Sequence, residues 1–180
     1  KMSFRMFSYF CQLNISRATI NIGGITANNK VYDGTTAASL NTGGATFNGQ
    51  ISGDNLTVSN VTGRFSDKNA GIGKTVNING ISLGGTDAGN YTLTNTTASS
   101  TADISQATIN SVTGIVAGNK FYDGTTTASL NTAGATFNGQ ISGDNLTVSN
   151  ATGRFSDKNA ANGKTVNING ISLGGTDAGN

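Results

Sequence analysis

The sequence Lys-Thr-Val-Asn-Ile-Asn-Gly-Ile-Ser-Leu, residues 74–83, contains the pattern that decides the fold. Apolar and polar residues alternate from Val76 to Ile78, and the alternation changes phase across Gly80 before it continues to Leu83. Alternation with a period of two is typical of a β-strand that buries one face. We therefore expect strands on both sides of Gly80, with a bend or a change of sheet at the glycine.

Short apolar runs separated by turn residues extend from this stretch in both directions. Strands are expected around Ile20 and Ile22, from Phe47 to Ile51, around Leu56 and Val58 with a bulge near Ser59-Asn60, around Tyr91 and Leu93, and around Ala102 and Ile104. Turns are expected at Asp33-Gly34, at Gly53-Asp54-Asn55, from Asp67 to Gly73 and from Gly84 to Asn90. Seven or eight short strands at this spacing predict an all-β domain that is sandwich-like or barrel-like.

The same unit occurs twice in the chain. Residues 29–90 align without gaps on residues 119–180, and only six positions differ. A period of 90 residues is the size of a domain rather than of a solenoid repeat, so each copy is expected to bury its own core. We divide the chain into a non-repeat leader or fragment boundary (1–17), repeat 1 (18–106) and repeat 2 (107–180).

Repeat 2 has no counterpart of the closing strands that follow Asn90 in repeat 1, so it is expected to be open-edged or partly disordered at its end. At the other end of the chain, Asn14-Ile15-Ser16 parallels Asp103-Ile104-Ser105, as though a preceding unit closed there.

Composition supports folded β domains. Gly, Thr, Asn and Ser make up just over half of the chain, and all nine acidic residues are Asp. Thr, Val and Ile favour strands, whereas Gly, Asn and Asp favour turns. Hydrophobic residues reach 35 % and recur throughout, which is typical of a folded protein rather than a disordered one.

The charge distribution argues against nucleic acid as a partner. The net charge of +2 comes from residues 1–17, which hold three basic residues and no acid, while the repeats are nearly neutral. Phosphate binding requires clustered Lys and Arg. The apolar stretch from Phe4 to Leu13 is too short to span a membrane, so no membrane insertion is expected. Cys11 is the single cysteine, which excludes a disulfide within the chain.

The residue types needed for catalysis are scarce, so we expect no enzyme and no cofactor. Without His, a Ser–His–acid triad is impossible. Gly73-Lys74-Thr75 resembles the end of a phosphate-binding loop, but Lys68 stands where that motif needs glycine, and a strand rather than a helix follows. The candidate paired carboxylates all lie beside Gly or Asn in predicted turns: Asp33, Asp54, Asp67 and Asp87.

Two stabilising chemistries remain as weaker alternatives. A calcium site would use Asp87 and Asn90 in repeat 1, or Asp177 and Asn180 in repeat 2, yet calcium prefers several carboxylates and each loop offers one. A Lys–Asn crosslink would use Lys30, Lys68 or Lys74, but no Glu is present to assist it. We predict no metal site.

Three motifs in order resemble the YDG repeat domain. They are Lys-Val-Tyr-Asp-Gly-Thr-Thr at 30–36, which recurs with Phe for Val at 120–126, then Asp-Lys-Asn-Ala-Gly-Ile-Gly-Lys-Thr-Val at 67–76, and Gly-Gly-Thr-Asp-Ala-Gly-Asn-Tyr-Thr-Leu at 84–93. The resemblance covers residues 18–180. It implies tandem repeats of a large bacterial exoprotein similar to filamentous haemagglutinin, exported to the cell surface, with no catalytic residues.

The Tyr-Asp-Gly motif also has a structural interpretation. Tyr32-Asp33-Gly34 and Tyr122-Asp123-Gly124 are predicted to be structural, because Asp-Gly favours a tight turn and Tyr buries its ring while its hydroxyl stays free to bond. The leading hypothesis is a spacer whose partners are neighbouring repeats of the same chain. The alternative is that the repeats themselves bind a host glycan or matrix protein.

Overall fold

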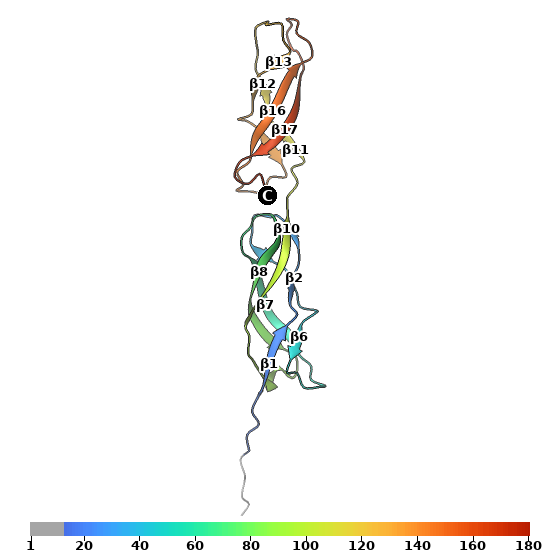
Figure 1. Cartoon of the computed structure of the whole chain (residues 1–180), viewed down its shortest axis with the longest axis vertical. Coiled ribbons are helices and arrows are strands. Elements are labelled where there is room, and N and C mark those ends of the chain that lie inside the picture. The colour runs from blue at the N-terminus through green and yellow to red at the C-terminus, as the bar shows by residue number, and fades with distance from the viewer. Residues whose placement is uncertain (1–12) are drawn as a thin grey trace, which may run out of the picture.

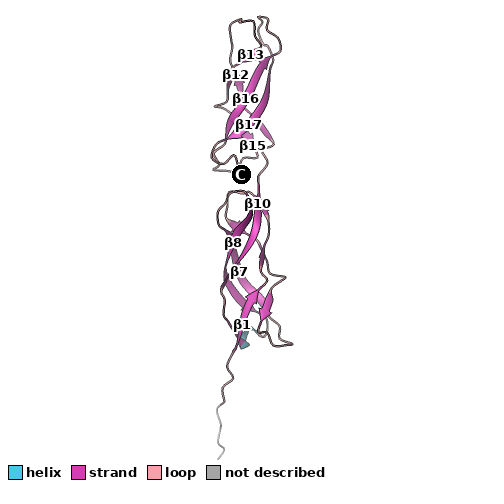
Figure 2. Ribbon diagram, in the orientation of Figure 1, coloured by secondary structure: helices cyan, strands magenta, loops and turns pink. Residues whose placement is uncertain are grey.

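The computed structural model describes residues 13–180, which form two β-rich repeats joined end to end (Figures 1 and 2). Cys11 and most of the predicted leader lie outside the described residues. Repeat 1 contains β1 (Ala18–Gly23), β2 (Thr26–Ala27), β3 (Lys30–Val31), β4 (Ala37–Ala38), β5 (Leu40–Asn41), β6 (Thr46–Asn48), β7 (Thr57–Phe65), β8 (Gly71–Gly84), the 3-10 helix η1 (Ala88–Asn90), β9 (Tyr91–Leu93) and β10 (Thr97–Ser105). Repeat 2 contains β11 (Ser111–Thr113), β12 (Val116–Ala117), β13 (Thr127–Ala128), β14 (Leu130–Asn131), β15 (Thr136–Asn138), β16 (Thr147–Phe155) and β17 (Val166–Gly174).

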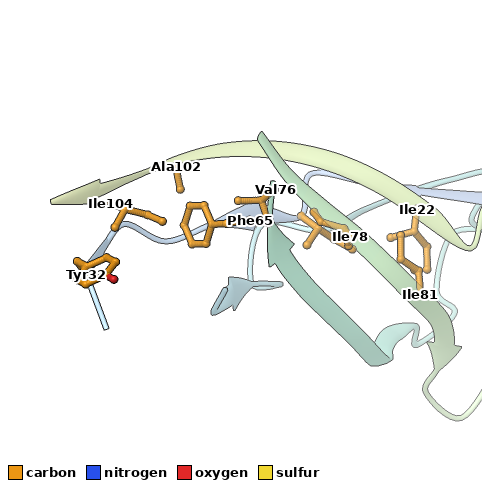
Figure 3. Close-up of a cluster of buried hydrophobic side chains, with 9 residues drawn as sticks. Ile22, Tyr32, Phe65, Val76, Ile78, Ile81, Ala102 and Ile104 are labelled. Carbon is orange, nitrogen blue, oxygen red and sulfur yellow. The ribbon is translucent and has the colours of Figure 1, made fainter. Parts of the chain in front are cut away.

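Repeat 1 is sandwich-like. Its larger sheet has five strands in the order β3-β10-β8-β7-β4, and its smaller sheet has three in the order β6-β1-β9, with β2 and β5 forming a separate pair. Apolar side chains of the two sheets meet between them: Ile22 of β1 lies in one cluster with Val76 and Ile78 of β8 and Ile104 of β10 (Figure 3). The predicted all-β class, with sandwich-like or barrel-like domains, is therefore confirmed.

The phase change across Gly80 is a β-bulge within a single strand. Thr62 pairs with Asn79 and Asn60 pairs with Ser82, so Gly80 and Ile81 together lie opposite one residue of β7. Gly80 has a φ of 68°, which suits glycine. The extra residue returns Ile81 to the buried face that Ile78 already occupies.

Other local predictions had mixed outcomes. A second register shift between Val58 and Asn60 confirms the bulge expected near Ser59-Asn60. The strand expected from Phe47 to Ile51 is wrong beyond Asn48. Gly49 turns the chain there with a φ of 103°, and a Cβ at that position would lie 2.6 Å from the Thr19 carbonyl oxygen.

The main sheet of repeat 2 has fewer strands than that of repeat 1. It has three strands, β13-β16-β17, because among the described residues no strand corresponds to β3 or β10 of repeat 1. β17 begins at Val166, whereas its counterpart β8 begins five positions earlier in the repeat, at Gly71. Of the side chains in the buried core, only Ala128 comes from repeat 2.

The two repeats lie one beyond the other along the long axis of the molecule (Figure 1). β10 ends repeat 1 at Ser105, and the chain passes directly into repeat 2, while Asn180 returns to the region between the repeats. No helix in residues 13–180 is long and apolar enough to cross a membrane.

Candidate functional site at the junction between the repeats

The Tyr-Asp-Gly turn is built by local contacts. Asp33 Oδ1 accepts a hydrogen bond from the backbone N–H of Thr35 at 2.8 Å, and Gly34 has the positive φ that the turn needs. The Lys30 ammonium lies 2.7 Å from the same carboxylate oxygen and donates to the Thr35 carbonyl at 2.8 Å. The hydrogen bond from Lys30, followed by those from Thr35, lowers the pKa of Asp33 to about 2.

Repeat 2 forms the same turn. Lys120 lies 2.7 Å from Asp123 Oδ1, Thr125 N–H donates to that oxygen at 2.9 Å, and Gly124 has a φ of 76°. The pKa of Asp123 also falls to about 2, first because of the Lys120 hydrogen bond. In both repeats the lysine, aspartate and threonine that form these bonds therefore lie within the seven residues of the motif.

The motif tyrosines, in contrast, differ between the repeats. Tyr32 is 3 % exposed and donates from its hydroxyl to Asp144 Oδ1 of repeat 2 at 2.7 Å, whereas Tyr122 is 64 % exposed. Figure 3 shows the Tyr32 ring at the end of the row of core side chains, next to Ile104. Tyr32 thus lies at the end of the core of repeat 1 and contacts the loop between β15 and β16 of repeat 2. The hydrogen bond to Asp144 and burial of the ring raise the pKa of Tyr32.

A shared lysine balances two carboxylates at this contact. Lys68 Nζ of repeat 1 lies 3.7 Å from Asp144 Oδ1 and 3.7 Å from Asp177 Oδ1, and it is 5.8 Å from the centroid of the Tyr32 ring. The Asp144 side chain is only 6 % exposed, so its charge needs partners. The Tyr32 hydroxyl and the two carboxylates raise the pKa of Lys68.

Apolar packing and backbone contacts complete the junction. The half-buried Ile141 packs against the core of repeat 1, and a Cβ at Gly34 would lie 3.1 Å from its Cγ2. Ala70 N–H donates to Asn180 Oδ1 at 3.0 Å, and the Asn180 amide donates to Asn69 Oδ1 at 3.4 Å. We call the repeat 1 side (Tyr32, Gly34, Lys68, Asn69, Ala70) the tyrosine end, and the repeat 2 side (Ile141, Asp144, Asp177, Asn180) the aspartate end.

The candidate calcium ligands form hydrogen bonds with the polypeptide itself. Asp87 Oδ2 accepts Asn55 N–H at 2.8 Å, and Asp177 Oδ2 accepts Asn145 N–H at 2.9 Å. That backbone bond is the main reason why the pKa of Asp177 is lowered. Asn90 ends η1, where its N–H donates to the Asp87 carbonyl oxygen. Within residues 13–180, no three acidic, His or Cys side chains come together in a group suited to a metal ion.

The lysines considered for a crosslink pair with aspartate rather than with asparagine amides. Lys30 contacts Asp33, Lys74 lies 2.6 Å from Asp67 Oδ1, and Lys68 faces Asp144 and Asp177. An amide bond to Asn would require each amine to leave a charged partner.

Each repeat also has an open groove at an equivalent position. The groove of repeat 1, of about 640 Å³, lies between β4 and β7 and is lined by small and aliphatic residues with Arg64. Its counterpart in repeat 2 has a volume of about 430 Å³ and includes Arg154. Neither groove is lined by an aromatic side chain on which a sugar ring could stack.

Sequence reasoning identified the motif tyrosine but not its partners. Lys68, Ile141 and Asp144 were not predicted to meet Tyr32, and the tyrosine–aspartate contact spans 112 positions of the chain. The sequence of a motif within one repeat does not reveal this contact, because the contact joins opposite ends of successive repeats.

The YDG domain family model matches residues 16–99 and again residues 105–180. Comparison with curated proteins and with solved structures gave no match.

Proposed function

The chain belongs to the YDG domain family, with two tandem copies, and from this premise we propose that it is a non-catalytic stalk segment of a large exported bacterial adhesin. In this role the repeats set the distance between the cell surface and a distal binding region. Their partners are the neighbouring repeats of the same chain.

The observation that carries the proposal is the junction. Two tandem domains act as one stiff rod only where their interface fixes the angle between them, because a bare linker leaves domains free to move. Here an ion-paired lysine, a buried tyrosine and a packed isoleucine join the two repeats: Lys68, Tyr32 and Ile141. The repeats are also joined end to end, the arrangement that gives the greatest reach per residue (Figure 1).

Small-angle X-ray scattering on the full chain tests the stalk. A single extended conformation is expected, with a maximum dimension that does not change between low and moderate salt. Ile141→Asp introduces a charge against the core of repeat 1 and should give a broader, more bent ensemble, while Ile51→Asp, at the equivalent exposed position of repeat 1, should leave the profile unchanged. A flexible ensemble for the unaltered chain would overturn the proposal.

A second experiment addresses direct adhesion. The full chain is applied to a glycan array and to immobilised matrix proteins, and no specific binding is expected. Saturable binding would show that the repeats themselves are adhesive and would replace the spacer role.

A further inference from the structure

The first and last strands of repeat 1 lead out of the domain at its opposite ends. β1 begins at the outer end of the molecule, and β10 ends at the junction with repeat 2 (Figure 1). In a stalk, tension acts along the long axis, so it pulls β1 and β10 in opposite directions. This direction of the load rests on the proposed stalk function.

The two loaded strands are connected through β9. β1 and β9 run parallel, with Ala18 beside Tyr91 and Ile20 beside Leu93. Only residues 94–96 separate β9 from β10, so a pull on β10 passes along the backbone into β9. The hydrogen bonds of a parallel pair are evenly spaced and run across from strand to strand. Tension along the strands therefore loads the β1–β9 bonds in shear, all at the same time.

Two residues that follow β9 extend this contact. Thr94 donates to the Ile20 carbonyl oxygen from its backbone N–H and from its hydroxyl, both at 2.9 Å. The Asn95 carboxamide acts in place of a strand backbone, because its Oδ1 accepts Ile22 N–H at 2.9 Å and its Nδ2 donates to the Ile22 carbonyl oxygen at 2.8 Å. The segment that leads directly into β10 thus holds β1 from Ala18 to Ile22.

Buried side chains of β1 strengthen this contact. Ile20 and Ile22 are each 1 % exposed. Ile20 packs with Leu56 and Tyr91, and Ile22 belongs to the larger core cluster (Figure 3). A strand that slips by one residue along its partner turns its side chains to the opposite face. Sliding of β1 along β9 therefore breaks core packing and hydrogen bonds in one step.

We propose that the contact of residues 18–22 with residues 91–95 is a mechanical clamp, which resists tension along the stalk and slows the forced unfolding of the repeat. All the bonds of the clamp lie within repeat 1. The clamp therefore does not depend on what precedes β1 or follows β10.

Force spectroscopy with two pairs of attachment points tests the clamp. In a Cys11→Ser background, Ser16→Cys/Gln106→Cys places handles at the two ends of repeat 1 and loads β1 in shear. Ser16→Cys/Ser52→Cys places both handles at the outer end, because the loop that contains Ser52 is hydrogen-bonded to Tyr91 beside the start of β1. This second pair peels β1 away one residue pair at a time. The shear pair should unfold at a force higher by about twofold or more.

The three positions that receive cysteine are exposed, so both chains should keep the circular dichroism spectrum of the parent. Equal unfolding forces in the two geometries would overturn the proposal, because a clamp resists shear more than peeling.

Asn95→Ala tests the clamp in the shear geometry. It removes both bonds to Ile22 and should make unfolding at a fixed force about tenfold faster. Ser100→Ala is the matched control, because it removes a side-chain bond to the Ala27 N–H that joins β10 to β2, outside the β1–β9 contact. It should change the same rate by less than about twofold.

Urea denaturation of both variants separates the clamp from general stability. If the two variants accelerate forced unfolding equally for an equal loss of stability, Asn95 has only a structural role and the proposal is wrong. The outcome is independent of the stalk role, which scattering tests on the chain without load. A flexible chain whose two pulling geometries still differ would remove the stalk role and leave the clamp as a property of the repeat.

Discussion

At the scale of the residue, the two motif tyrosines have the same local structure but different tertiary contacts. Both follow the same lysine and form the same turn, yet Tyr32 is buried against repeat 2 and Tyr122 is exposed. The hydroxyl of Tyr32 is thus a contact between repeats rather than part of the turn.

This difference gives a mutational prediction with an internal control. Tyr32→Phe removes the hydrogen bond to the nearly buried Asp144 carboxylate, and should lower the free energy of unfolding by about 1–2 kcal/mol. Tyr122→Phe, which removes a hydroxyl with no such partner, should change stability by less than about 0.5 kcal/mol. Urea denaturation followed by tyrosine fluorescence measures both. Equal effects in the two variants would show that the hydroxyl acts within the turn.

The turn carboxylates predict how stability depends on pH. The pKa of Asp33 and of Asp123 is about 2 in the folded chain, below the ordinary value of 3.8. Because the folded pKa is the lower one, each group contributes stability above pH 4 that is lost as the pH falls toward 2. The melting temperature should therefore drop over this interval, and it should drop less in Asp33→Asn/Asp123→Asn. An unchanged pH profile in the double variant would contradict this assignment.

At the scale of the element, the strands in which apolar and polar residues alternate could be predicted from the sequence, and the shortest strands could not. β8 buries Val76 and Ile78, and β10 buries Ala102 and Ile104, so alternate residues are buried in each strand and leave a readable pattern. β2, β3, β4 and β5 have two residues each, too few to show a period, and their positions depend on the longer strands beside them. The strand expected to reach Ile51 stops at Asn48 because of a backbone constraint at Gly49, which hydrophobic alternation does not reveal.

The bulge in β8 gives a prediction of its own. Gly80→Ala places a Cβ on a residue with a φ of 68° and should cost about 1–2 kcal/mol of unfolding free energy, although the space around Gly80 is open. Gly89→Ala, in η1, also meets no atom within 4 Å but has no positive φ, so it should be neutral or slightly stabilising. Thermal melts followed by circular dichroism compare them. A neutral Gly80→Ala would mean that the bulge relaxes without strain.

At the scale of the whole molecule, the interface between the repeats covers one end of the core of repeat 1. Repeat 1 buries twelve of the thirteen apolar residues of the described core, and Ile141 of repeat 2 packs against its end. Sequence analysis predicted two repeats and a structural role for the Tyr-Asp-Gly motif within each of them. It did not predict the junction, since the sequence of Tyr32 and its neighbours is nearly the same in both repeats, and only their position in the array decides which tyrosine is buried.

Because repeat 1 buries more apolar side chains than repeat 2, we predict that repeat 1 has the higher free energy of unfolding. Ile78 is fully buried in β8, whereas its counterpart Ile168 in β17 is only half-buried, because no described strand covers that edge. Ile78→Ala should destabilise repeat 1 by about 2–5 kcal/mol, and Ile168→Ala should cost repeat 2 less. Hydrogen exchange resolved by residue should show β17 opening before β8, and each substitution should change protection mainly in its own repeat. Uniform loss of protection in both repeats from either change would mean that the junction makes the chain one cooperative unit.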